Sequence, residues 1–262
     1  MTAYWGELRQ NWRPLLAATI GLGTGMSLIG IVISTMAPAL ISGNGWTQAD
    51  FAMIGTLGLF SSLTLPFVGR LADVLGVKRT ALIGQVAMPL TYLAYSLQDG
   101  AIGTYIGIFI FQGIVGMTTT ATVYARLAVQ YVEKARGLAL AIVVSGPALA
   151  GMVVGPWLND YVEANGWRSS FETVAIWTAA AGLIAFLLIP KDAGPVPGAA
   201  APKRRAREDY PLILRTPAFW FLLIAMALCN LPLTLLLVQL KALVLANGIT
   251  PEGAGVMLFA VP

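Results

Sequence analysis

The sequence predicts an all-α polytopic membrane protein, and three observations lead to that fold class. Only 11% of the 262 residues are charged, whereas a soluble domain carries about 25% charged residues. Hydrophobic residues make up 57% of the chain, and the mean hydropathy is +0.77. The apolar residues also gather in long runs. Because so few charges cannot cover a water-soluble domain of this size, much of the surface must face lipid.

The apolar runs have the length of membrane-spanning helices, which need about 20 mostly apolar residues. Glu172 is the only charge inside the seven complete runs, and it lies at the end of one. Lipid offers the backbone no hydrogen-bond partners, so each run must be helical. An eighth run begins near Gly253. The seven complete runs are Pro14–Ile41, Phe51–Val68, Thr80–Leu97, Ile102–Tyr124, Leu138–Leu158, Phe171–Ile189 and Phe219–Val238.

The basic residues predict the orientation of these spans, because lysine and arginine are enriched in cytoplasmic segments. With the N-terminus in the cytoplasm, the outer segments keep only Arg168 and Lys241. The inner segments then hold Arg9, Arg13, Arg70, Lys78, Arg79, Lys134 and Arg136. We therefore predict a multi-pass protein of the inner (plasma) membrane with a cytoplasmic N-terminus. The cytoplasmic basic residues then explain the net charge of +4 without a nucleic-acid partner. The predicted partner is the lipid bilayer.

One segment, residues 191–216, is not a membrane span. It contains Pro195, Pro197 and Pro202, an alanine tract and the basic cluster Lys203, Arg204, Arg205 and Arg207. This composition is typical of a disordered linker. The sequence thus predicts a six-helix bundle over residues 1–190, a cytoplasmic basic linker over 191–216, and the start of a C-terminal half over 217–262.

A weak internal repeat supports this division, since transporters are often built from repeats. An offset of 203 residues pairs Pro14 with Pro217, each at the entry to a span. The same offset pairs Asn44, Gly45 and Thr47 with Asn247, Gly248 and Thr250. A second half of equal length would end near residue 393, by about the same offset. We therefore expect the sequence to be a fragment that stops early in helix eight.

The segment from Gly69 to Arg79 reads Gly-Arg-Leu-Ala-Asp-Val-Leu-Gly-Val-Lys-Arg, between the second and third spans. It resembles the G-x-L-A-D-x-x-G-x-K-R signature of the major facilitator superfamily, which lies in the same loop. The resemblance covers nearly the whole chain and implies the major facilitator fold. It also implies a conformational latch formed by Gly69, Asp73, Gly76, Lys78 and Arg79. The alternative is that these residues are only positive-inside charges around a tight turn.

Two arginines of neighbouring segments extend this predicted latch. Arg126 lies at the inner end of the fourth span, and Arg136 follows in the next loop. We expect Arg126 to pair with Asp73 across the two cytoplasmic segments. The alternative is an arginine that extends its side chain to the membrane interface without a partner.

The stretch from Tyr131 to Leu140, followed by Ser145-Gly146-Pro147 and Gly155-Pro156, is similar to the monocarboxylate and oxalate–formate transporter branch of the superfamily. That resemblance implies secondary active transport of a small solute, such as a small organic anion, by alternating access of two six-helix halves. A coupling proton or a counter-substrate is then a further partner. Gly151-x-x-x-Gly155-Pro156 also partly resembles a motif of drug antiporters, although we favour close helix packing for this glycine pair. Efflux of drugs or metabolites is the alternative function.

Polar residues inside the spans are the candidates for a substrate cavity, because a buried polar group is costly in lipid without a partner. The alternative role for such groups is hydrogen bonding between helices. For the hydroxyl groups we favour that alternative, and for the two amides both roles stay open. The candidates are Thr24, Ser27, Gln112, Thr118, Thr119 and Asn230.

The remaining composition argues against catalysis and cofactors. The chain has no histidine and a single cysteine, Cys229, so we predict neither a metal site nor a cofactor. No glycine-rich phosphate loop with a lysine is present, which argues against ATP-driven transport by this chain. We therefore predict that the protein is not an enzyme. A non-transporting scaffold or receptor is the third alternative if the natural chain is this short.

Overall fold

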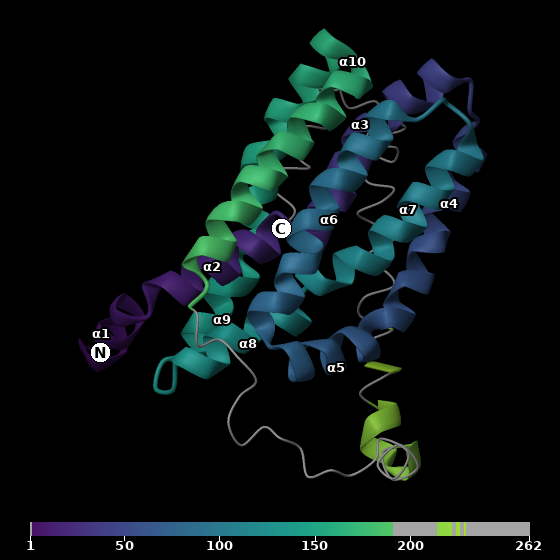
Figure 1. Cartoon of the computed structure of the whole chain (residues 1–262). Coiled ribbons are helices and arrows are strands. Elements are labelled where there is room, and N and C mark those ends of the chain that lie inside the picture. The colour runs from purple at the N-terminus through teal and green to yellow at the C-terminus, as the bar shows by residue number, and fades with distance from the viewer. Residues whose placement is uncertain (1, 191–213, 222–223, 226–227, 229–262) are drawn as a thin grey trace. The chain divides into compact units, whose positions relative to one another are not determined.

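The computed structural model describes residues 2–190, 214–221, 224–225 and 228, and the regular elements in these residues are helices (Figure 1). The chain divides into two compact units, Met1–Ala199 and Ala200–Pro262. That division falls within the predicted linker, most of which lies outside the described residues. The predicted seventh span is described only in part, and the eighth is not described. The boundaries of the three predicted segments therefore stay predictions.

The first predicted span is broken in its middle. A short helix, α1 (Thr2–Gln10), precedes α2 (Trp12–Gly23), and the span continues as α3 (Met26–Asn44). Thr24 and Gly25 separate α2 from α3, with Gly25 at φ −89° and ψ −138°. The prediction of one continuous helix was therefore wrong at this point. Glycine is a poor helix former, and Gly25 interrupts the helix beside two further glycines of α2.

The second span begins with α4 (Gln48–Ser61) and continues through η1 (Ser62–Thr64) into α5 (Leu65–Leu75). At its start, the Thr47 N–H donates to the Asp50 carboxylate at 3.0 Å, and the Asp50 N–H donates to the Thr47 hydroxyl at 3.1 Å. This reciprocal pairing satisfies N–H groups that a helix start leaves open.

The segment that the sequence predicted as a loop is helical except for one residue. Helix α5 continues to Leu75, and α6 begins at Val77 and ends at Leu97. Gly76 alone makes the turn, at φ +80°, a conformation that favours glycine. Val68 and Ala72, one helical turn apart, are buried and hold α5 against the bundle. The predicted tight turn at Gly76 is confirmed, while the predicted loop before it was wrong.

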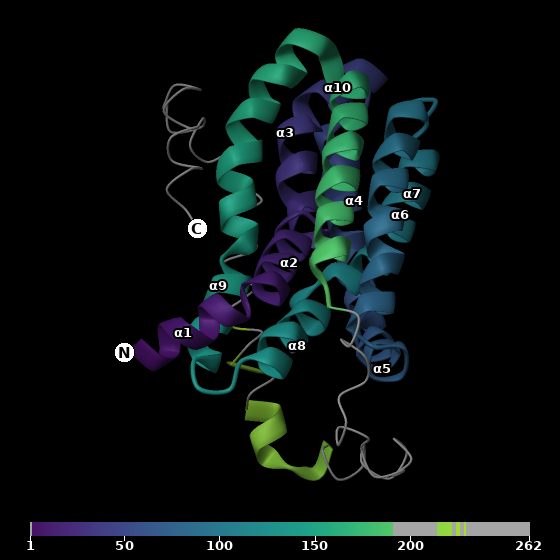
Figure 2. The same ribbon diagram turned by 60° about the vertical axis from the view of Figure 1, so that its left-hand side comes forward.

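The fourth, fifth and sixth spans include a break at η2, a one-residue interruption at Ser145 and one sharp turn. The fourth span consists of α7 (Ile102–Gly116), η2 (Met117–Thr119) and α8 (Ala121–Tyr131). Helix α9 (Arg136–Val144) leads into α10 (Gly146–Leu188), which contains a non-helical residue, Gly166, at φ +78°. Figure 2 shows the two arms of α10 lying antiparallel on either side of that turn, so they supply the fifth and sixth spans.

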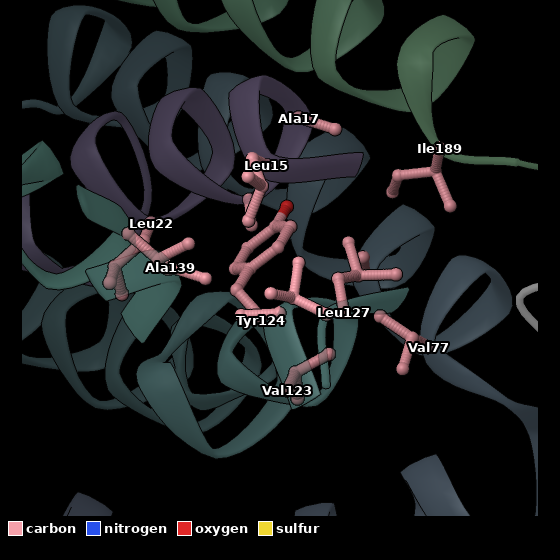
Figure 3. Packing of buried hydrophobic residues seen from close by; sticks show 14 of the residues in the cluster. Leu15, Ala17, Leu22, Val77, Val123, Tyr124, Leu127, Ala139 and Ile189 are labelled. Atoms are coloured by element: carbon pink, nitrogen blue, oxygen red, sulfur yellow. The ribbon is translucent and has the colours of Figure 1, made fainter. Parts of the chain in front are cut away.

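Two buried clusters hold the first unit together. One surrounds Tyr124, whose hydroxyl points toward α2, where Leu15 and Ala17 lie (Figure 3). The other is aromatic: the ring of Tyr95 lies 5.0 Å from that of Phe171 and 4.8 Å from that of Tyr105. Both clusters join residues from at least three spans, so neither forms within a single helical hairpin.

Three helical stretches among the described residues are long and apolar enough to cross a membrane: Trp12–Asn44, Ile102–Tyr131 and Arg136–Leu188. Helix α6 is also long enough, at 21 residues. It carries Gln85, Thr91 and several other hydroxyl groups, which lower its hydropathy. The predicted class of a polytopic all-α membrane protein is confirmed by these helices.

Candidate functional site

The breaks in the first and fourth spans lie against each other. Thr119, in η2, accepts a hydrogen bond on its hydroxyl from the Met26 N–H at 2.9 Å. The same hydroxyl donates to the Gly116 carbonyl at 2.7 Å. Met26 is the first residue of α3, so a threonine from one broken span satisfies the open helix start of the other. We call the group of Thr24, Gly25, Met26 and Met117–Thr119 the broken-helix junction.

The helices pack so closely at this junction that two positions have room only for glycine. A Cβ atom on Gly25 would lie 2.4 Å from the Thr119 hydroxyl oxygen. A Cβ atom on Gly84 of α6 would lie 2.3 Å from the hydroxyl oxygen of Thr118. Three spans therefore meet at the junction in direct contact, and their packing depends on these two glycines.

The hydroxyl candidates from the sequence lie in or beside the junction. The hydroxyl of Thr24 donates to the Ile20 carbonyl at 2.8 Å, and that of Thr118 donates to the Val115 carbonyl at 2.7 Å. Ser27 is exposed in the first turn of α3. These side chains are neutral. Thr118 and Thr119 are buried, and the Thr119 hydroxyl is already engaged as donor and acceptor. Asn230 lies outside the described residues.

Gln112 is fully buried between α7 and α6. Its side-chain amide donates to the Thr91 hydroxyl at 3.0 Å and accepts from the Tyr95 hydroxyl at 3.1 Å. Both ends of the amide are thus engaged in hydrogen bonds between helices, as the alternative for this residue required. A role of Gln112 in a substrate cavity stays a prediction.

Gln85 of α6 is a second buried amide, and it was not predicted from the sequence. Its side-chain nitrogen donates to the Tyr124 hydroxyl at 2.6 Å. Its oxygen has no hydrogen-bond partner among the residues that the structure describes. The signal was available, because Gln85 is an amide inside an apolar run, as Gln112 is.

Asp73 and Arg126 form an ion pair between α5 and α8, the pairing expected from the sequence. Arg126 also donates to the Gly69 carbonyl at 3.2 Å. A Cβ atom added to Gly69 would lie 3.9 Å from Arg126 and Thr122, an ordinary van der Waals contact, so the approach of the two helices does not itself require glycine here. The pair is the only ion pair within the part of the chain that the structure describes.

The other predicted latch residues make separate contacts. Lys78 donates to the Ile189 carbonyl at 2.8 Å, and Arg79 is exposed. Arg136 folds back onto the end of α8, where it donates to the carbonyls of Val132 and Val129 at 3.2 and 3.3 Å. The structure therefore brings Asp73, Arg126 and Gly69 together but leaves these three basic residues outside that group.

A further contact near the same end involves Glu7 of α1, which the sequence analysis did not single out. The Glu7 carboxylate accepts hydrogen bonds from the backbone N–H groups of Glu133 and Ala135, both at 2.8 Å, and from Lys134 at 3.1 Å. Ala135 is the N-cap of α9 and has no side-chain oxygen of its own. Glu7 thus holds the turn that precedes α9, and these N–H groups hold the pKa of Glu7 below its usual value.

Replacing Glu7 with glutamine is expected to release the 133–135 segment at neutral pH. The variant lacks the negative charge that favours these N–H groups, so their hydrogen exchange should be several-fold faster than in the wild type. Because the folded-state pKa of Glu7 is lowered, its stabilisation of this turn is present above the unfolded value of about 4.5 and is lost as pH falls through the folded pKa. The two proteins should therefore converge at low pH. Glu163→Gln, at an exposed glutamate of α10, is the control, and equal exchange in all three proteins at neutral pH would contradict the role of Glu7.

Comparison with known proteins identifies a family and a related protein. A family model described as Major Facilitator Superfamily matches residues 15–261. The chain is also similar to Multidrug resistance protein 2 of Bacillus subtilis (strain 168), with 28% identity over 163 residues. That alignment covers 60% of this chain and 37% of the relative, so the chain matches well under half of the relative's length.

Proposed function

Since the chain belongs to the Major Facilitator Superfamily, we propose that it is a secondary active transporter of a small solute, working by alternating access of two six-helix halves. In this proposal the protein is not an enzyme and needs no cofactor. It is driven by a coupling proton or a counter-substrate. It lies in the inner membrane with its N-terminus in the cytoplasm, as the basic residues predict.

The broken-helix junction is the observation that carries this proposal. Discontinuous helices in transporters expose backbone N–H and carbonyl groups in the membrane, where they can bind substrate or a coupling ion. Here the first and fourth spans are both interrupted, and the interruptions are joined by the hydrogen bond from the Met26 N–H to Thr119. We propose that Thr24, Ser27, Thr118 and Thr119 line the part of the substrate path that this unit supplies.

Two substrate classes follow from different observations. The resemblance to the monocarboxylate and oxalate–formate branch, mainly over residues 131–190, supports a small organic anion. The relative named as a multidrug resistance protein supports efflux of drug-like compounds. The described part of the junction has no cation to bind an anion. A transported anion would therefore need a positive charge from another part of the protein.

Uptake by vesicles containing the full-length protein distinguishes these classes. Under an imposed pH gradient, vesicles should accumulate radiolabelled formate, oxalate or lactate if the substrate is an organic anion. Accumulation of a fluorescent cationic dye instead would indicate drug efflux. If neither kind of compound moves faster than in protein-free vesicles, the proposal of secondary transport is wrong.

Replacing Thr119 with valine is expected to impair transport through the junction. The Met26 N–H would lose its acceptor, and leaving a buried donor unsatisfied costs about 1–3 kcal/mol. Thr119→Ser keeps the hydroxyl and should restore most of the uptake. Thr35→Val in α3 is the control, because no hydrogen bond of the Thr35 hydroxyl is present among the described residues. Equal uptake by the valine and serine variants would show that this hydrogen bond has no part in transport.

A further inference from the structure

A groove runs along the outside of the bundle between α6 and the second arm of α10, with a volume of ≈ 420 Å³. The two helices are in close contact beneath it, since a Cβ atom on Gly182 would lie 3.3 Å from that of Gln85. The residues that form its rims are large and apolar: Leu82, Val86 and Leu90 on α6, and Ile176, Leu183 and Phe186 on α10.

The groove has the length of one lipid chain in one leaflet. Its wall on α6 extends from Leu82 to Leu93, which corresponds to about 17 Å at about 1.5 Å per residue. Half of a hydrocarbon core of about 30 Å is about 15 Å. The groove therefore covers approximately one leaflet of the membrane.

Two basic residues continue the same face of α6 beyond one end of the groove. Lys78 and Arg79 lie four and three residues before Leu82, so both are on its side of the helix. The Lys78 ammonium donates to the Ile189 carbonyl at 2.8 Å and lies 4.7 Å from the centre of the Phe186 ring, which lines the groove. Neither residue forms an ion pair with a carboxylate in the described part of the chain.

The start of α6 adds to the attraction for an anion at this end. The helix begins at Val77, so Lys78 and Arg79 stand in its first turn, where the helix dipole is positive. The N-cap is Gly76, which supplies no side-chain acceptor for the first N–H groups. Basic side chains in a first turn are unfavourable by themselves. A bound phosphate would interact favourably with the side chains and with the helix start.

We propose that this groove binds an anionic phospholipid, with one acyl chain between α6 and α10 and the phosphate at Lys78 and Arg79. The apolar rims fit a hydrocarbon chain, and the two basic side chains at one end fit the headgroup of the same lipid. The site is separate from the broken-helix junction, and its existence does not depend on the substrate or on transport.

Photo-crosslinking tests the site on the full-length protein in phosphatidylcholine nanodiscs. Trace phosphatidylglycerol or phosphatidylcholine probes would carry a diazirine in one acyl chain, and labelled peptides would be identified by mass spectrometry. The phosphatidylglycerol probe should label residues 82–93 and 175–186 about tenfold more than the phosphatidylcholine probe, because two basic residues each favour an anionic lipid. Excess inorganic phosphate should not reduce the labelling. Full competition by phosphate would mean a site for the free anion and would overturn the proposal.

Variants separate the headgroup from the acyl chain. Lys78→Gln with Arg79→Gln should lower phosphatidylglycerol labelling to the phosphatidylcholine level, while Arg9→Gln with Arg13→Gln should leave the preference intact. Arg79→Gln alone leaves the hydrogen bond from Lys78 to Ile189 intact. It should still lower the preference for phosphatidylglycerol over phosphatidylcholine by about threefold. Ala179→Phe, which narrows the groove, should reduce labelling by both probes. Equal labelling by the two probes in the wild type, or no labelling because protein covers the groove, would overturn the lipid site.

Discussion

Gly84→Ala is expected to destabilise the first unit and to abolish transport. The new Cβ atom would lie 2.3 Å from the Thr118 hydroxyl oxygen, 2.4 Å from the Thr119 methyl carbon and 3.3 Å from the Val115 carbonyl oxygen. Real Cβ contacts are not that short, so η2 would have to move away from α6. Overpacking of this kind costs about 1–3 kcal/mol. Because η2 also holds the start of α3 through Thr119, the movement would separate the two broken spans.

Thermal unfolding in detergent and vesicle uptake measure the two effects of Gly84→Ala. Gly107→Ala in α7 is the matched control, because no atom lies within 4 Å of its added Cβ. That variant should be neutral or more stable, since alanine favours a helix more than glycine does. Adding Thr118→Ala and Thr119→Ser to Gly84→Ala removes the two closest atoms and keeps the Met26 hydrogen bond, so stability should recover. Wild-type stability of Gly84→Ala alone would contradict the tight junction.

The sequence predicted the helical class because apolar composition and run length depend on the hydrophobic effect alone. It did not predict the break at Thr24–Gly25. The glycines near the break are a local signal, but the acceptor for the Met26 N–H comes from Thr119, 93 residues away. The local sequence pattern likewise predicted a loop over residues 69–75. In the structure that segment is helical, and Val68 and Ala72 are buried against the bundle.

Only part of the candidate site was predicted, because several of its contacts also depend on how distant helices pack. Charges stand out in an apolar chain, so the sequence alone was enough to match Asp73 with Arg126. The amide of Gln112 stood out equally, but its hydrogen bonds to Thr91 and Tyr95 depend on how α6 packs against α7. Glu7 was overlooked, because its partners are backbone N–H groups, which carry no signal in the sequence.

The ion pair between Asp73 and Arg126 provides the second large expected effect. Asp73→Asn and Arg126→Ala should each lower the transport rate by about tenfold, the size of a typical coupling between conformational states. Their effect on unfolding should be small, because the side chains are 56% and 32% exposed and such ion pairs contribute about 0–1 kcal/mol. A large loss of transport with little loss of stability is the signature expected of the proposed latch, and a purely structural ion pair would not give it.

A double-mutant cycle decides whether the two residues act together. If the latch depends on their contact, the Asp73→Asn and Arg126→Ala double variant should transport no worse than either single variant. Arg126→Lys keeps the charge but loses the geometry that also reaches the Gly69 carbonyl, so it should lie between the wild type and Arg126→Ala. Asp160→Asn, at an exposed aspartate of α10, is the control and should transport normally. Additive losses in the double variant would mean that Asp73 and Arg126 act independently, and the latch would then have to be assigned to other contacts of α5 and α8.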